Sequence, residues 1–261
     1  MSYSSTPLWL LSTLILTVLI AARELGHWFR NRRKASSSAG DGAAEDGFAM
    51  TSMLGLLALL IAFSFSIGLQ RYETRRELVI SEANAIGTTW LRTHLLGEAD
   101  RIRLQALLRE YVDTRVEFGN ASTVEEERAA SGRTEALQER LWDATSDVVT
   151  PFRTTPLAAL LVTTTNESID LAATRKATRE ARIPSRILEI LMLYALIAGV
   201  MIGYEKGRYR IATSLLFVLL TLAASVVLDL DRPATGAIRV SQQPMLDLQR
   251  AIAKQQQQTD Q

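Results

Sequence analysis

The chain of 261 residues contains no cysteine and only two histidines, His27 and His94. The absence of cysteine excludes disulfides, thiolate catalysis and cysteine-ligated metal sites. The two histidines lie far apart in the sequence, so a histidine metal cluster within one chain is not expected. The sequence also contains no phosphate-binding loop, nucleophile elbow or metalloprotease motif. We therefore expect no enzymatic activity, no catalytic residue, no metal site and no cofactor.

Neither sign of charge is in excess. Lysine and arginine number 29 and the acidic residues 28, for a formal net charge of +1, which gives no reason to expect nucleic acid as a partner. No strand-like alternation and no internal repeat is visible. Hydrophobic residues make up 48% of the chain and are clustered in four runs. The predicted class is therefore an all-α membrane protein with four spans, whose first partner is the lipid bilayer.

The stretch from Phe48 to Arg92 organises the rest of the chain. Its first half, up to Gln70, carries no charge, and a membrane span needs about 20 apolar residues. Its second half begins at Arg71, is charged and keeps helical spacing, and no proline interrupts the stretch. We therefore predict one continuous helix that begins in the membrane and ends in an aqueous domain.

Small residues recur every three or four positions along the apolar half, at Thr51, Gly55, Ala58, Ala62 and Ser66. In lipid, such a stripe allows helix backbones to approach closely. Two interpretations stay open at this point. The stripe can serve simple helix packing, or it can line a narrow pore between identical subunits.

Three further apolar runs cover Pro7 to Ala22, Ile187 to Tyr204 and Ile211 to Leu228. The first has no positive charge ahead of it and no clean cleavage site after it. It therefore indicates a retained transmembrane helix and not a signal peptide. The last two runs are separated by a very short loop, which predicts an antiparallel transmembrane hairpin.

These segments divide the chain into four predicted parts, with a helical soluble domain inserted between the second and third spans. They are residues 1–70, transmembrane helices 1 and 2 with a basic flexible loop; 71–183, the helical extramembrane domain; 184–229, the hairpin of transmembrane helices 3 and 4; and 230–261, a C-terminal turn with a short amphipathic tail.

Within the extramembrane domain, amphipathic helices are predicted near Glu98 to Phe118, Val124 to Val149 and Leu157 to Arg182. Leu141 and Trp142 are expected to point into the core from the second of these helices.

Polar side chains occur on two helices of this domain that could pack side by side. Glu82 and Asn84 follow the central span, and Asn166 and Asp170 lie four residues apart on one helix face. A structural polar network, an ion-binding site and a catalytic pair are the open interpretations, and oxygen ligands suit calcium or magnesium best. A buried Glu82 would need a cationic partner. The two candidates are Arg92 and Arg175.

A third polar group closes the fourth span, where Asp229 and Asp231 precede a turn with Pro233 and Gly236. The two carboxylates either end the span or hold it to the extramembrane domain through ion pairs. The candidate partners for such pairs are Arg71 and Arg76.

Several segments together resemble the bacterial bestrophin-like membrane proteins, a family catalogued as a domain of unknown function. They include LLALLIAFSFS, EANAIGT, TTTNESIDLAATRKA and DLDRPATGAIRVSQQP, and the resemblance covers Gly55 to Leu248. The family is distantly similar to the bestrophin anion channels. The resemblance implies the order of two spans, helical domain, two spans and turn, and a homopentamer whose second span lines the pore.

By this resemblance Phe63 matches the aromatic residue that faces the bestrophin neck, although Gly55 and Leu59 depart from the family pattern. The predicted pore-lining residues are Gly55, Leu59, Ala62, Phe63 and Ser66. The acidic run of the bestrophin calcium clasp is missing here, so the resemblance does not carry over a calcium gate. Bestrophins keep the soluble domain in the cytoplasm, whereas the basic short loops favour the opposite orientation, and the orientation stays open.

The leading prediction is thus a homo-oligomeric ion channel of the bacterial cell (inner) membrane that conducts inorganic anions, with its pore lined by the second span. The alternative is a non-conducting membrane scaffold or sensor whose helical domain binds a partner. A membrane-embedded enzyme is the third class, and no recognisable motif supports it.

Overall fold

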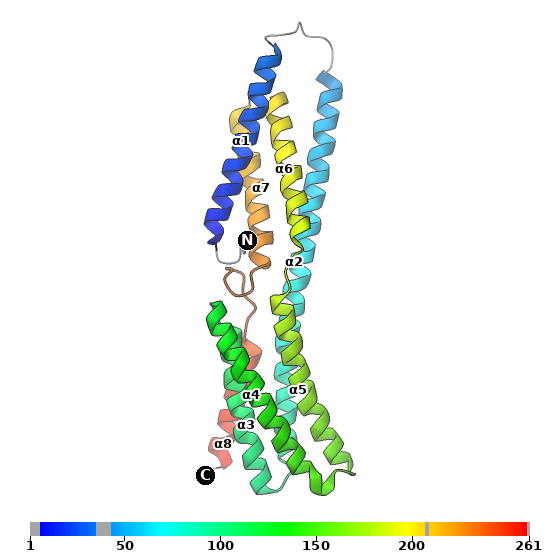
Figure 1. Ribbon diagram of the computed structural model, residues 1–261, viewed down its shortest axis with the longest axis vertical. Coiled ribbons are helices and arrows are strands. Elements are labelled where there is room, and N and C mark those ends of the chain that lie inside the picture. The colour runs from blue at the N-terminus through cyan, green and yellow to red at the C-terminus, as the bar shows by residue number, and fades with distance from the viewer. Residues whose placement is uncertain (1–5, 35–42, 207–208, 260–261) are drawn as a thin grey trace. The chain divides into compact units, whose positions relative to one another are not determined.

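The computed structural model describes residues 6–34, 43–206 and 209–259. Within these ranges the secondary structure is helical and contains no strand, which confirms the all-α prediction (Figure 1). The helices are α1 (Leu8–Lys34), α2 (Ala43–Thr93), α3 (Glu98–Asn120), α4 (Val124–Val149), the 3₁₀ turn η2 (Thr150–Phe152), α5 (Pro156–Glu180), α6 (Ser185–Lys206), α7 (Arg210–Leu230) and α8 (Gln243–Thr259).

Four segments of the described chain are long and apolar enough to cross a membrane, which agrees with the predicted four spans. They belong to α1, α2, the α5–α6 segment and α7. The segments are Leu8–Arg32, Met50–Thr93, Pro156–Glu205 and Arg210–Leu230. Part of the predicted basic loop, residues 35–42, lies outside the described residues.

The chain forms two compact units, which we call the membrane unit and the bundle unit. The membrane unit consists of Met1–Arg71, Arg182–Arg232 and Gly236–Ile238. The bundle unit consists of Tyr72–Ala181, Pro233–Thr235 and Arg239–Gln261. Helix α2 contributes to both units as one uninterrupted helix of 51 residues, so the predicted continuity through Arg71 is confirmed.

In the membrane unit, α1 lies against α6 and α7 (Figure 1). Glycines allow α1 and α6 to approach closely, because a Cβ added at Gly203 would overlap the Arg23 carbonyl and lie 2.9 Å from Arg23 Cα. Arg23 is itself buried and donates to the Thr213 hydroxyl at 3.1 Å and the Ser214 hydroxyl at 2.7 Å, which ties α1 to α7.

In the bundle unit, α3 packs against α4 and α8, and α4 packs against α5. Helix α4 begins with a capping box in which Thr123 accepts from the Glu126 backbone and Glu126 reaches back to Thr123. The core is apolar, and its fully buried members include Ile86, Leu104, Leu108, Tyr111, Leu141 and Leu161.

Two features of the bundle unit go beyond the sequence prediction or correct it. Helix α8 is part of the core through Met245 and Ile252, and Trp90 Nε1 donates to Gln255 Oε1 at 2.6 Å. Trp142 was expected in the core but is 39% exposed. Its neighbour Leu141 occupies the inward position, and successive helical residues point about 100° apart.

Candidate functional site

The five predicted pore-lining residues all lie on an exposed face of α2 in the membrane unit. Leu59 and Phe63 are 64% and 61% exposed, and Gly55, Ala62 and Ser66 are exposed as well. At about 100° per residue, these five positions fall within an arc of roughly 100°. We call this face the α2 stripe, formed by Gly55, Leu59, Ala62, Phe63 and Ser66.

The opposite face of α2 makes the contacts inside the membrane unit. Leu57 and Ser64 are each 2% exposed, and a Cβ at Gly68 would lie 3.3 Å from the Leu230 side chain. In contrast, a Cβ at Gly55 would meet nothing within 4 Å. Among the described residues, the chain's own helices therefore leave the α2 stripe uncovered, and close packing within one chain does not account for its small residues.

In the bundle unit, a buried carboxylate lies between two buried arginines. Glu82 on α2 is fully buried, and its two oxygens accept from Arg115 Nε and from Arg175 Nη1, the latter at 2.5 Å. Arg115 comes from α3 and Arg175 from α5, and neither is more than 4% exposed. The cluster therefore joins three helices by charge-assisted hydrogen bonds among buried side chains.

The ring of Phe118 forms the apolar side of this cluster. The guanidinium carbons of Arg115, Arg175 and Arg179 lie 4.4, 5.5 and 5.2 Å from its centroid. Such cation–π contacts are strongest where the cation is desolvated, and Phe118 is fully buried.

Tyr111 borders the cluster on α3. Its hydroxyl accepts from Gln138 Nε2 at 3.1 Å and donates to the Ser168 carbonyl at 3.4 Å. Burial raises the pKa of Tyr111 from 10.0 to about 12; the Arg115 charge opposes this increase in pKa and the Glu82 charge adds to it.

The other members of the predicted polar network are not gathered around Glu82. Arg92 donates to the carbonyl of Leu160 on α5, and Asn84, Asn166 and Asp170 are exposed. Asn84 cannot share the Glu82 environment, since residues two apart on a helix point about 160° away from each other. Sequence reasoning missed Arg115, although its spacing of four from Tyr111 and seven from Leu108 puts it on the buried face of α3.

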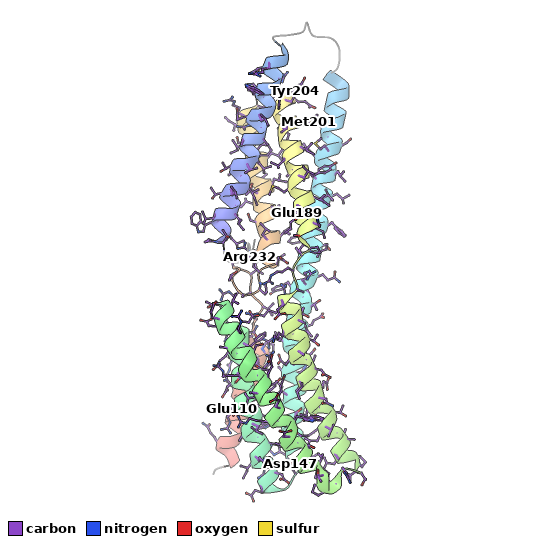
Figure 2. All side chains as sticks on the ribbon, in the orientation of Figure 1. Glu110, Asp147, Glu189, Met201, Tyr204 and Arg232 are labelled. Carbon is purple, nitrogen blue, oxygen red and sulfur yellow. The ribbon has the colours of Figure 1, made fainter. Side chains whose placement is uncertain are left out.

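Charge pairs at the surface of the bundle unit differ from this cluster in burial. Glu110, labelled in Figure 2, pairs with Arg140 at 3.2 Å, and both side chains are more than half exposed. Asp147 pairs in the same way with Arg103 at 3.0 Å. Exposed pairs of this kind contribute about 0–1 kcal/mol, so they do not determine the fold.

The acidic residues at the end of α7 are bound to backbone amides. Asp229 accepts from the amides of Ala237 and Ile238 at 2.7 and 2.9 Å, and Asp231 accepts from the Ile183 amide at 2.7 Å. Both Asp229 oxygens therefore serve the chain reversal at the end of the span.

Gly236 is required in this reversal, because a Cβ there would lie 2.7 Å from Asp229 Oδ1 and from the Arg232 carbonyl. Pro233, the remaining member of the predicted turn, belongs to the bundle unit. Within the described residues, no group of three or more histidine or acidic side chains is arranged to hold a metal ion.

A comparison of the sequence with family models identifies the family of this chain. Residues 17–245 match the family model of the bestrophin-like domain. The chain belongs to the bestrophin-like family. No functionally curated protein matches it.

Solved structures show the same fold. A crystal structure of a bacterial bestrophin homolog from Klebsiella pneumoniae carrying a point mutation aligns with a TM-score of 0.69 and 10% identity, covering 92% of this chain and 97% of that one. A second structure of a K. pneumoniae homolog aligns with a TM-score of 0.66 and 12% identity, covering 93% and 96%. A further structure, described as a membrane protein, gives 0.67 at 12% identity, with 95% and 98% covered.

Proposed function

We propose that this bestrophin-like protein is a homo-oligomeric ion channel of the bacterial cell membrane, with its conduit lined by the α2 stripes of several copies. The family and the fold support a membrane protein of channel type. The observation that carries the finer proposal is the exposure of Gly55, Leu59, Ala62, Phe63 and Ser66 along one face of α2. A helix that is apolar, small-faced and uncovered by its own chain is suited to gather around an axis with identical helices.

The side chains of the stripe suit a narrow, gated conduit. Copies of Phe63 and Leu59 around one axis would form apolar rings, and an apolar constriction can close a pore by dewetting. Gly55, Ala62 and Ser66 would leave room between such rings because their side chains are small.

Inorganic anions are the proposed permeating ions. The stripe carries no carboxylate, whereas rings of acidic side chains are the usual device of cation channels. The family's distant similarity to the bestrophin anion channels supports the same choice, and five copies is the number that this similarity favours.

Chloride flux through reconstituted vesicles tests the proposal. The purified full chain in liposomes should release chloride faster than empty vesicles do. Phe63→Ala should increase the flux several-fold, since it widens an apolar constriction. Leu219→Ala is the matched control, because Leu219 is a similarly exposed apolar side chain (57%) on α7 of the same unit and should leave the flux unchanged.

Flux equal to that of empty vesicles for both the unchanged chain and Phe63→Ala would contradict conduction. Particle images of the detergent-purified protein then distinguish the non-conducting scaffold. A ring of copies around a central opening is expected for the channel, whereas a monomer or a dimer without an opening supports the scaffold.

A further inference from the structure

A cavity in the bundle unit is lined by four arginines. It has a volume of about 250 Å³. Its polar lining comes from α2, α3, α5 and the segment that leads into α8, and none of the described residues that line it is acidic. We call it the arginine pocket, defined by Arg75, Arg175, Arg179 and Arg239. The lining residues Asn120, Ser241 and Gln242 add amide and hydroxyl groups.

Three of these arginines are almost fully buried, and two of them are held in place by carbonyl groups at the ends of helices. Arg75, Arg175 and Arg179 are each at most 8% exposed. Arg75 donates to the Thr178 and Ala181 carbonyls at 3.2 and 2.9 Å, at the end of α5. Arg179 donates to the Ala121 carbonyl at 2.9 Å, just after α3, and to Glu127 at 2.9 Å. These contacts fix the guanidinium groups in place before any ligand arrives.

The third buried arginine connects the pocket to the Glu82 cluster. Arg175 donates to Glu82 at 2.5 Å and to the side-chain oxygen of Gln242. Glu82 is shared with Arg115, whose Nη2 is buried and has no hydrogen-bond partner among the residues that the structure describes. One carboxylate between two guanidinium groups leaves this cluster with an excess positive charge, and burial weakens the screening of that charge by solvent.

Gly119, near the end of α3, has no side chain and therefore leaves room for the polar groups of Gln242 and Arg175 at this corner of the pocket. A Cβ at Gly119 would overlap the Gln242 amide and lie 2.7 Å from Arg175 Nη2. Arg239 and Ser241, in contrast, are exposed at the rim, which gives a ligand access from solvent.

We propose that the arginine pocket binds a phosphate group. Guanidinium groups present planar forks of N–H donors that match the oxygens of phosphate, and several preorganised arginines make the recognition strong. The cavity has room for a group of this size, and Asn120 and Ser241 supply neutral donors at the rim. The group is either free inorganic phosphate or the phosphodiester of a lipid headgroup. The site lies outside the α2 stripe, so the inference is independent of conduction.

Binding of inorganic phosphate to the full chain in detergent tests the site. Calorimetric titration at constant ionic strength should show one saturable site per chain, and chloride at the same concentration should not replace phosphate. Bound phosphate should also raise the unfolding temperature, because it bridges groups from several segments that separate on unfolding.

Two rim variants keep the buried arginines intact. In the unchanged chain, the Gln243 backbone N–H donates to the Ser241 hydroxyl at 3.2 Å. Ser241→Asp keeps an acceptor for this N–H but adds a negative charge at the rim. Arg239→Gln removes an exposed cation. Each should weaken phosphate binding by about tenfold or more, as the loss of one charge-assisted contact does. Arg128→Gln is the matched control, since Arg128 is an exposed arginine on α4 outside the pocket, and it should bind as the unchanged chain does.

The same titration with dihexanoyl phosphatidylglycerol distinguishes the two sources. Saturable binding of inorganic phosphate that both rim variants weaken assigns the site to free phosphate. Saturable binding of the short-chain lipid alone, weakened in the same way, assigns it to a headgroup. The proposal would be overturned if neither probe binds. It would also be overturned if Ser241→Asp and Arg239→Gln bind the probe with the same affinity as Arg128→Gln.

Discussion

At the scale of the residue, Glu82 supplies the negative charge that faces two buried arginines of the bundle unit. Its single carboxylate faces Arg115 and Arg175, and all three side chains are almost completely buried. A buried ion pair gains little over an apolar core, but removing one partner leaves an uncompensated charge in a medium that solvates it poorly. Loss of the Glu82 charge should therefore lower the free energy of unfolding strongly.

Glu82→Gln tests this directly. The substitution keeps the shape of the side chain but leaves two buried guanidinium groups without their counter-charge, and it should lower the free energy of unfolding by about 3–5 kcal/mol. Thermal or denaturant unfolding of the purified chain measures the change. Glu110→Gln is the control, because the exposed pair with Arg140 should contribute about 0–1 kcal/mol. Equal effects of the two substitutions would show that Glu82 is not the essential anion.

The raised pKa of Tyr111 predicts that the folded chain loses stability at high pH. Burial raises the pKa of Tyr111 from 10.0 to about 12, so the unfolded chain releases this proton at a lower pH than the folded chain. The associated stability is complete below pH 10 and is lost as the pH rises towards 12, by about 2–3 kcal/mol in total. In Tyr111→Phe that loss should be absent. Unfolding midpoints between pH 8.5 and 11.5 measure it, and a constant difference between the two proteins across this range would refute it.

The sequence allowed part of this cluster to be predicted. Arg175 was a candidate partner of Glu82, and the structure brings the two together. Arg115 was missed because an arginine among the apolar positions of an amphipathic helix is normally assigned to the surface. Asn166 and Asp170 do share one face of α5, but Thr165, Ser168 and Ala172 occupy the buried face. Spacing along a helix shows which residues lie together, and it does not show which face the neighbouring helices cover.

At the scale of the element, the contact of α1 with α6 depends on glycines, which have no side chain to keep the two backbones apart. Gly203 lies against the Arg23 backbone and Gly26 against the Val200 backbone, closer than a Cβ permits. Backbone atoms cannot move aside as the end of a flexible side chain can, so an added methyl group must separate the two helices. An added Cβ at Gly132 on α4, in contrast, would meet nothing within 4 Å.

Gly203→Ala should therefore lower the thermal stability of the detergent-purified protein, by about 1–3 kcal/mol or more. Gly132→Ala makes the same chemical change on α4, where an added Cβ would meet nothing within 4 Å, and should not lower the stability. Thermal unfolding followed by size-exclusion chromatography compares the two variants. If Gly203→Ala is as stable as Gly132→Ala, the close approach of α1 and α6 is not a feature of the protein.

Elements with strong local signals were predicted well. The bounds of α4, Val124–Val149, were predicted as the structure has them, because Thr123 and Glu126 cap its start and Pro151 follows its end. The packing of α8 was not predicted, since an amphipathic pattern indicates that a helix has an apolar face without indicating what covers it. Met245 and Ile252 find that cover in the core of the bundle unit.

At the scale of the whole molecule, the α2 stripe is an exposed apolar surface for which we propose identical helices as the partner. Scattered apolar side chains on α1, α6 and α7 are expected to face lipid acyl chains. The stripe differs because small residues alternate with Leu59 and Phe63 along one narrow face, which suits contact with, or a conduit between, identical helices. A conduit lined by the α2 stripe requires that water reach this face in the assembled protein.

Water access to single cysteines in the membrane measures this requirement most directly. The natural chain contains no cysteine, so each substitution introduces the only thiol. In reconstituted vesicles, Ala62→Cys and Ser66→Cys should react with a charged, water-soluble methanethiosulfonate and lose chloride flux as they react. Leu219→Cys, on the face of α7 expected to contact lipid, should remain unmodified. If Ala62→Cys and Ser66→Cys are as unreactive as Leu219→Cys, the α2 stripe does not line an aqueous conduit.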